Sequence, residues 1–265
     1  MVQSTPFSIS PNPGSLYQTE KIKGVMSKVK FVIDQRQGLT VILGDAGLGK
    51  TTIARALYAE FSGRPDVAIT FVPTPVYTSD FAMLRSLCED FGGSPRRSFT
   101  LQMEEFQSIL HDNFKEDKNV VVIIDEAQRL NYKMLEAIRA CLNFETDKQK
   151  LVQFVLAGQL ELRDMLRSYR NKALFSRVTA PSLLDALTPE DSTAMIGYRC
   201  KTAGIDNPFD KAAMNRIYEL TNGVARDALK LCALAYELMK MSGDKAIDVD
   251  LIDSAWDESQ IDDPE

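Results

Sequence analysis

The chain has 265 residues, of which 45% are hydrophobic and 26% charged, a globular composition that excludes disorder along the whole length. The length suits one large domain or two small ones. No apolar stretch approaches the ~20 residues of a membrane span, and the N-terminus lacks the basic and apolar segments of a secretory signal. We therefore expect a cytoplasmic protein with no membrane partner. Four widely spaced cysteines and one histidine favour reduced core thiols over a zinc site or disulfides.

The net charge of −6 is concentrated near the C-terminus. Residues 244–265 contain nine acidic side chains and one lysine, so this segment carries −8 and the rest of the chain carries +2. A near-neutral body neither requires nor excludes nucleic acid as a partner, and a local basic patch would decide between the two. We expect residues 259–265 to form an acidic tail.

Apolar patterning predicts alternating strands and helices over the first two thirds of the chain. A proline-rich extended arm over residues 6–14 precedes an amphipathic helix around residues 22–33. The expected strands are residues 39–43, 67–72, 120–124 and 152–157. The expected helices between them are residues 50–61, a helix capped by Ser79 or Asp80, residues 101–114 and residues 132–142. This alternation predicts a parallel sheet covered by helices on both faces.

Beyond residue 187 the pattern predicts helices alone. Thr188 is a suitable N-cap for a helix with Pro189 in its first turn, and further helices are expected near residues 209–220, 225–241 and 248–256. We therefore expect an α/β domain over residues 1–187 and a small all-helical domain over residues 188–258.

A glycine-rich loop follows the first expected strand. Residues 44–51 match the pattern G-x-x-x-x-G-K-[ST] between a strand and a helix, the context in which this pattern binds phosphate. Lys50 is expected to reach the β- and γ-phosphates, and the hydroxyl of Thr51 to bind Mg²⁺. The expected nucleotide-binding residues are Gly44, Asp45, Ala46, Gly47, Leu48, Gly49, Lys50, Thr51 and Thr52.

A second motif ends the apolar strand at residues 120–124, where Asp125 and Glu126 follow directly. Two carboxylates at the end of a buried strand are costly unless cations or hydrogen-bond donors meet them. We expect Asp125 to complete the Mg²⁺ environment and Glu126 to orient or deprotonate the attacking water. The two motifs together predict an enzyme that binds and hydrolyses ATP.

These motifs, followed by a helical domain, resemble those of the AAA+ ATPases. The segments Asp125-Glu-Ala-Gln-Arg-Leu130, Leu156-Ala-Gly-Gln159 and Asn222-Gly-Val-Ala-Arg226 are similar to the ExeA-type branch, which is close to the transposition ATPases TnsC, TniB and MuB. The resemblance implies a three-layer α/β P-loop ATPase fold with a helical lid. It also implies ATP and Mg²⁺ as cofactors and ATP-driven assembly into a ring or helical filament.

The resemblance assigns further site residues. Gln159 matches the sensor that contacts the γ-phosphate or the catalytic water, although a polar loop residue is the alternative. Arg226 matches the second sensor, but Ala225 stands where the branch usually has proline. Arg177 matches the arginine that completes a neighbouring subunit's site, with Arg170 as the second choice.

The remaining assignments concern the arm and nucleic acid. Phe7 and Tyr17 either cover the adenine or pack on the edge of the sheet. In oligomeric relatives, loops like those that carry Thr78, Arg96, Arg97 and Lys133 face a channel where such side chains hold DNA phosphates, and ordinary surface charge is the alternative.

The sequence thus predicts an ATPase that assembles on duplex DNA and recruits or licenses a transposase. The alternatives are an ExeA-like partner of a secretion or envelope apparatus and a protein-only switch in a defence system. ExeA-like members usually add a membrane span and a wall-binding domain, and the end of the chain at residue 265 favours the DNA-associated alternative.

Overall fold

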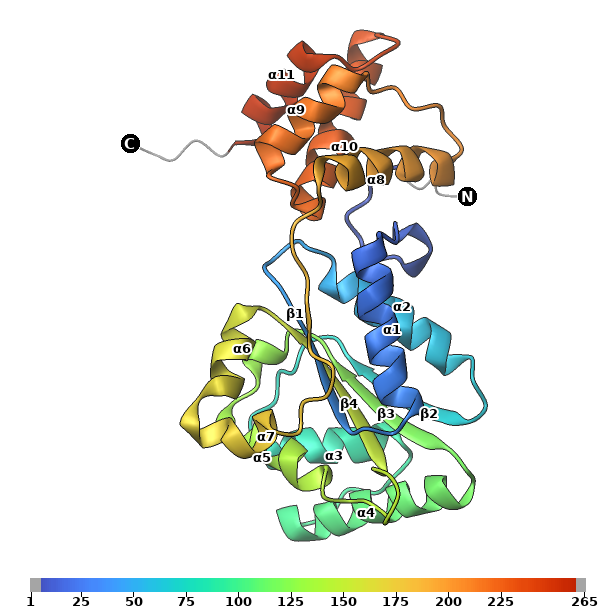
Figure 1. The fold of residues 1–265 in the computed structure, drawn as a ribbon, viewed down its shortest axis with the longest axis vertical. Coiled ribbons are helices and arrows are strands. Elements are labelled where there is room, and N and C mark those ends of the chain that lie inside the picture. Colours follow the sequence, from blue (N-terminus) through green and yellow to red (C-terminus); the bar gives the residue numbers. More distant parts are fainter. Residues whose placement is uncertain (1–5, 261–265) are drawn as a thin grey trace. The chain divides into compact units, whose positions relative to one another are not determined.

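The computed structural model describes residues 6–260, and these residues form two compact units (Figure 1). The α/β unit contains residues 20–45 and 50–184, and the helical unit contains residues 6–19, 46–49 and 185–260. This division differs from the expected one because the arm and the middle of the glycine-rich loop group with the helices. Of the expected acidic tail, residues 261–265 lie outside the described residues.

The α/β unit is built on a parallel sheet with the strand order β2-β3-β4-β1-β5. The strands are β1 (Leu39–Leu43), β2 (Val67–Val72), β3 (Asn119–Ile124), β4 (Val152–Gly158) and β5 (Ser182–Leu183). Strands β1, β3 and β4 are buried at every position, as expected for parallel strands covered on both faces. The predicted fold class is confirmed.

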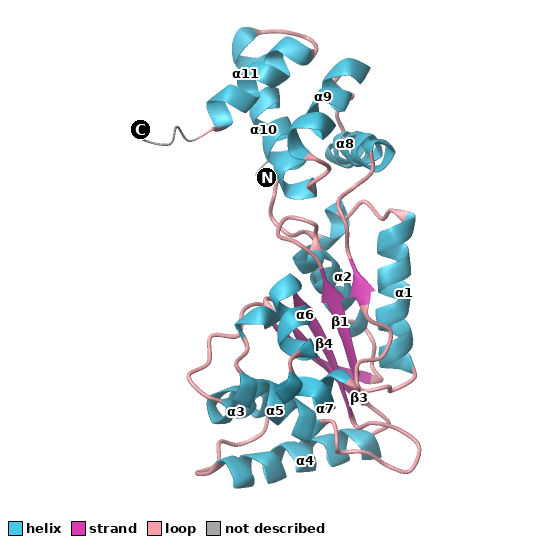
Figure 2. Cartoon of the chain, turned by 60° about the vertical axis from the view of Figure 1, so that its left-hand side comes forward, coloured by secondary structure: helices cyan, strands magenta, loops and turns pink. Residues whose placement is uncertain are grey.

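Helices cover both faces of this sheet (Figure 2). Helices α1 (Glu20–Asp34) and α2 (Lys50–Ser62) lie on one face (Figure 1). The other face carries α3 (Asp80–Asp90), α4 (Phe99–Lys115), α5 (Tyr132–Cys141), α6 (Leu160–Arg167) and α7 (Lys172–Phe175). Alternate residues of β3, such as Val120 and Val122, pack against this second set of helices. Two short 3₁₀ turns, η2 (Ala127–Arg129) and η3 (Tyr169–Asn171), join these elements.

The helical unit contains α8 (Pro189–Ala203), α9 (Lys211–Thr221), α10 (Ala225–Ser242) and α11 (Val249–Ser259). The predicted start of its first helix is confirmed: the Thr188 hydroxyl accepts a hydrogen bond from the backbone N–H of Asp191 and Pro189 lies in the first turn. Its apolar core includes Cys200 and Cys232. None of the helices within residues 6–260 is long and apolar enough to cross a membrane.

The N-terminal arm packs on this helical core. Phe7 is 1% exposed, and its ring meets those of Phe209 and Tyr236 edge-on at 5.5 and 5.8 Å. Tyr17 lies against Tyr198 at 5.6 Å. The arm also contains a 3₁₀ turn, η1 (Pro13–Ser15), where an extended chain was predicted. The sheet-edge expectation for Phe7 is wrong because its ring packs in the apolar core of the helical unit, and the adenine expectation stays a prediction.

Candidate active site

The candidate site lies at the carboxyl edge of the sheet, where ligands bind in open α/β folds. Strand β4 lies between β1 and β3, with Leu43 opposite Gly158 and Ile124 opposite Leu156. The segments that follow these three strands are the glycine-rich loop, the Asp-Glu pair and Gln159. The topology therefore gathers the three predicted motifs at one edge.

Lys50 begins α2 directly after the glycine-rich loop and is 6% exposed. Its ammonium group donates hydrogen bonds to the backbone oxygens of Gly44, at 2.8 Å, and Asp45, at 2.7 Å. A buried cation held by its own loop is positioned to meet phosphate oxygens that enter that loop. Thr51 and Thr52, in the first turn of α2, are half-buried.

The middle of the loop packs tightly against the start of α10, within the helical unit. The backbone N–H of Arg226 donates to the oxygen of Gly47 at 3.1 Å. A Cβ atom added to Gly47 would lie 2.7 Å from Cγ1 of Val224, and the residue has a φ of +83°. Gly49 has a φ of +98° with open space around it. The side chain of Arg226 is exposed.

Asp125 is 1% exposed at the end of β3. Burial raises the pKa of its carboxyl above the ordinary value, although the Thr51 hydroxyl donates a hydrogen bond to it and the nearby Lys50 ammonium favours the ionised form. The backbone N–H of Glu126 also donates to Oδ1 of Asp125 at 3.0 Å. Thr51 and Asp125 thus present two adjacent oxygen ligands of the kind that Mg²⁺ prefers.

Glu126 is half-buried and has a left-handed backbone, with φ of 50° and ψ of 36°. Its carboxylate accepts a hydrogen bond from the side chain of Gln128 at 2.5 Å. Gln128 in turn accepts a hydrogen bond from the backbone N–H of Gln159 at 3.1 Å. Sequence reasoning quoted Gln128 within a motif but gave it no part in the site.

Gln159 is the residue before α6 and is half-buried. It therefore occupies the predicted position at the end of β4, next to the strand that carries Asp125 and Glu126.

Arg177 follows α7. Its guanidinium donates to the backbone oxygen of Ala173 at 2.6 Å and to Oδ1 of Asn143 at 3.0 Å. Arg170 lies 5.8 Å from the ring centre of Tyr132. Both arginines occupy the segment after α6 in which a residue acting on another subunit was predicted.

The four residues predicted to meet DNA fall into two groups. Thr78 and Lys133 are exposed and follow the neighbouring strands β2 and β3. Arg96 and Arg97 are exposed at the other end of α3, which at 1.5 Å per residue is about 16 Å long. Arg96 is ion-paired with Glu105 at 2.5 Å, an interaction between loop and helix that the sequence pattern does not indicate.

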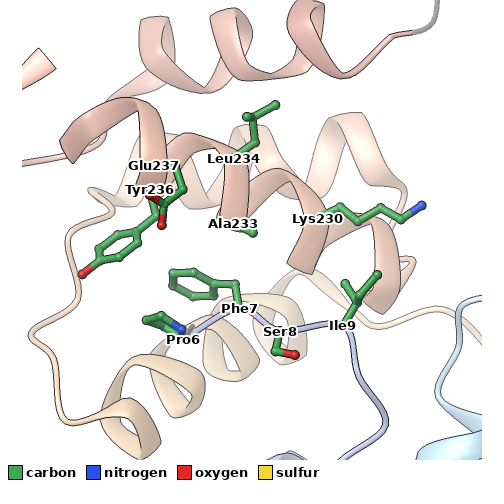
Figure 3. Close-up of a pocket in the computed structure, with 9 residues that line it drawn as sticks. All are labelled: Pro6, Phe7, Ser8, Ile9, Lys230, Ala233, Leu234, Tyr236 and Glu237. Carbon is green, nitrogen blue, oxygen red and sulfur yellow. The ribbon is translucent and has the colours of Figure 1, made fainter. Parts of the chain in front are cut away.

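A cavity of about 470 Å³ lies in the helical unit, between residues 6–9 of the arm and α10 (Figure 3). Lys230, Ala233 and Tyr236 contribute to its wall from α10. Its lining contains none of the residues of the glycine-rich loop.

Comparison with known proteins identifies this arrangement. A family model described as the AAA domain matches residues 33–166, half of the chain. General secretion pathway protein A of Aeromonas hydrophila is 32% identical over 230 residues, which cover 86% of this chain. The chain spans 42% of the length of that relative.

Solved structures share the fold at low sequence identity. The Aeropyrum pernix ORC2 protein, solved as ADPNP–ADP complexes, has a TM-score of 0.74 and 16% identity, covering 100% of this chain and 73% of its own. The Aeropyrum pernix ORC1 protein in complex with DNA has a TM-score of 0.68 and 14% identity, covering 96% of this chain and 68% of its own. The similarity to the ExeA-type branch is supported by the secretion-pathway relative.

Proposed function

The chain belongs to the AAA domain family, and we propose that it is an ATPase that hydrolyses ATP with Mg²⁺ at the carboxyl edge of its sheet. The observation that carries this proposal is a buried ammonium, Lys50, next to a buried carboxylate, Asp125, with the Thr51 hydroxyl bonded to that carboxylate. When bound, Mg²⁺ would neutralise the negative charge of the phosphates. Thr51 and Asp125 are the residues that would hold it.

The other residues then have separate tasks. Lys50 and the loop N–H groups bind the phosphates, and Glu126 orients the attacking water and accepts its proton. Gln159 contacts the γ-phosphate or that water, and Arg226 reaches the γ-phosphate from the start of α10. Each of these roles follows the resemblance to AAA+ ATPases.

We further propose that ATP drives assembly into a ring or filament in which Arg177 completes the site of a neighbouring copy. Arg177→Ala should lower hydrolysis by about 10³-fold, as removal of such arginines does in related chemistry, and should leave the nucleotide affinity of the monomer unchanged. Mixing this variant with Lys50→Ala chains should restore part of the activity, because some interfaces then hold both an intact loop and an intact arginine. A mixture that co-assembles without rescue would assign Arg177 a role within its own chain.

The biological role that we propose is assembly on duplex DNA to recruit or license a transposase, as for TnsC, TniB and MuB. Exposed Thr78, Arg97 and Lys133 support a phosphate-binding surface, and the ORC1 protein of similar fold was solved with DNA. The second candidate is a cytoplasmic ATPase that serves a secretion apparatus. The 32% identity with General secretion pathway protein A favours this candidate.

Fluorescence anisotropy of labelled duplex DNA, with and without a slowly hydrolysed ATP analogue, separates these candidates. DNA recruitment predicts ATP-dependent binding that weakens steeply with salt and depends little on base sequence. The variant Arg97→Ala with Lys133→Ala should flatten the salt dependence. Arg96→Ala is the matched control, since its charge is already paired with Glu105. Absence of ATP-dependent binding at low salt would leave the secretion candidate.

A further inference from the structure

The side-chain amide of Gln128 spans the ends of two neighbouring strands. Its Nε2 donates to Oε2 of Glu126, which follows β3, at 2.5 Å. Its Oε1 accepts the backbone N–H of Gln159, which follows β4, at 3.1 Å. One amide therefore connects the catalytic carboxylate to the segment of β4 that carries the predicted phosphate sensor.

Three features support a role for this bridge. An amide offers a separate donor atom and acceptor atom at the end of one flexible side chain, so it can bond both partners at once. Gly158 leaves room for it, since a Cβ atom there would lie 3.0 Å from Oε1 of Gln128. Glu126 also adopts a left-handed backbone that costs non-glycine residues ~1–3 kcal/mol, a kind of strain found at functional sites.

We propose that Gln128 is a positioning residue that orients the Glu126 carboxylate toward the attacking water. This inference rests on the proposed ATPase function and deepens it. The bond to Oε2 fixes the plane of the carboxylate and leaves Oε1 to accept the proton of the attacking water. Through its second hydrogen bond, Gln128 also contacts the backbone of Gln159. The carboxylate of Glu126 and the sensor Gln159 therefore keep a fixed relative position.

The first test is Gln128→Met, which keeps the length of the side chain and removes both hydrogen bonds. The expected result is a fall in kcat of about 10²-fold, the loss that misplacement of a catalytic group causes, with KM for ATP and Tm close to wild type. Gln107→Met, on the exposed face of α4, is the matched control and should change none of these quantities. Wild-type kcat in Gln128→Met would overturn the proposal. If ATP affinity and Tm fall together with kcat, the proposal is overturned as well, because such a pattern indicates a structural role.

A second variant keeps the test decisive if Gln128→Met does not fold. Gln128→Glu retains the acceptor for the Gln159 N–H but removes the donor to Glu126, so kcat should again fall about 10²-fold. Wild-type kcat in this variant would show that the donor is unnecessary.

The pathway of the effect is tested in the Glu126→Gln background under single-turnover conditions. If Gln128 acts through Glu126, adding Gln128→Met should change the residual rate by less than about twofold, since coupled positions are not additive. A further loss as large as that in wild type would overturn the proposal. Failure of the proposed function is distinguishable, because wild-type protein would then hydrolyse no ATP.

Discussion

The two ends of strands β1, β3 and β4 both bury polar side chains, but among the described residues only the carboxyl end buries charged ones. At the amino end, Oε1 of Gln153 accepts the Gly38 N–H at 2.7 Å, and its Nε2 donates to Oδ1 of Asn119 at 3.2 Å. Asn119 in turn donates to the backbone oxygen of Ile33 at 2.7 Å. At the carboxyl end, Lys50 and Asp125 are charged groups that are almost fully buried.

This difference separates a stabilising network from a chemical one. Neutral amides whose donors and acceptors are paired fasten the strands together at little cost. Buried charges cost free energy, so their presence indicates a site maintained for another purpose. Burial of polar groups alone does not distinguish the candidate active site, whereas burial of charge beside the glycine-rich loop does.

The largest expected effect is on catalysis at the charged end. Glu126→Gln should lower kcat by about 10²- to 10⁴-fold, the contribution of a general base, with Tm and ATP affinity unchanged. Steady-state hydrolysis measures the change in kcat, and thermal unfolding of the same preparation measures the Tm. A wild-type rate would remove Glu126 from the mechanism.

The next largest effect concerns stability at the neutral end. Gln153→Met should lower the free energy of unfolding by about 2–4 kcal/mol, because the Gly38 N–H and the Asn119 amide lose buried partners. The kcat of the folded protein should not change. Denaturant unfolding measures the loss of stability. A fall in kcat under conditions where the variant is fully folded would contradict the separation between a stabilising end and a catalytic end.

A smaller effect of opposite sign is expected at Asp125. Asp125→Asn removes a buried charge while keeping an oxygen for Thr51, so the nucleotide-free protein should gain about 1 kcal/mol of stability. Hydrolysis should be lost. An unchanged or lower Tm would indicate that the carboxylate is not a source of instability.

The smallest effect is expected away from both strand ends, at Glu105. The Ser94 N–H and Arg96 hold the pKa of this carboxyl below its ordinary 4.5, so its contribution to stability is present above pH 4.5 and is lost as pH falls through the lower folded value. Glu105→Gln should therefore lower Tm slightly at pH 7 and narrow its difference from wild type in acid. A difference that persists at pH 3 would contradict this linkage.

Local sequence predicts the parts of the site that contiguous residues build. The glycine-rich loop and the Asp-Glu pair are short motifs with fixed spacing, and the caps at Ser79 and Thr188 act within one turn. The longer strands of the sheet could also be predicted from the sequence, because runs of mainly apolar residues mark them. Only the two-residue β5 and the short elements around α6 and α7 lacked a clear signal.

The rest depends on contacts between distant residues. Phe7 enters the helical core, although nothing in the arm itself distinguishes that destination from a sheet edge. The Arg96–Glu105 pair and the Gln128 bridge depend on how side chains turn once strands and helices are packed. The grouping of the arm depends on such contacts as well, since the arm precedes the α/β unit in sequence but packs with helices that follow it.

The packing around Gly47 has a consequence for how the loop tolerates change over evolution. The phosphate-binding pattern leaves this position unspecified, yet a single added carbon would collide with Val224. Gly49, which the pattern requires, has open space and is constrained by its backbone angle alone. In a library of loop variants selected for folding, position 47 should be the more invariant of the two, with asparagine as the tolerated exception at position 49. In this chain, position 47 is therefore constrained by packing even though the phosphate-binding pattern allows any residue there.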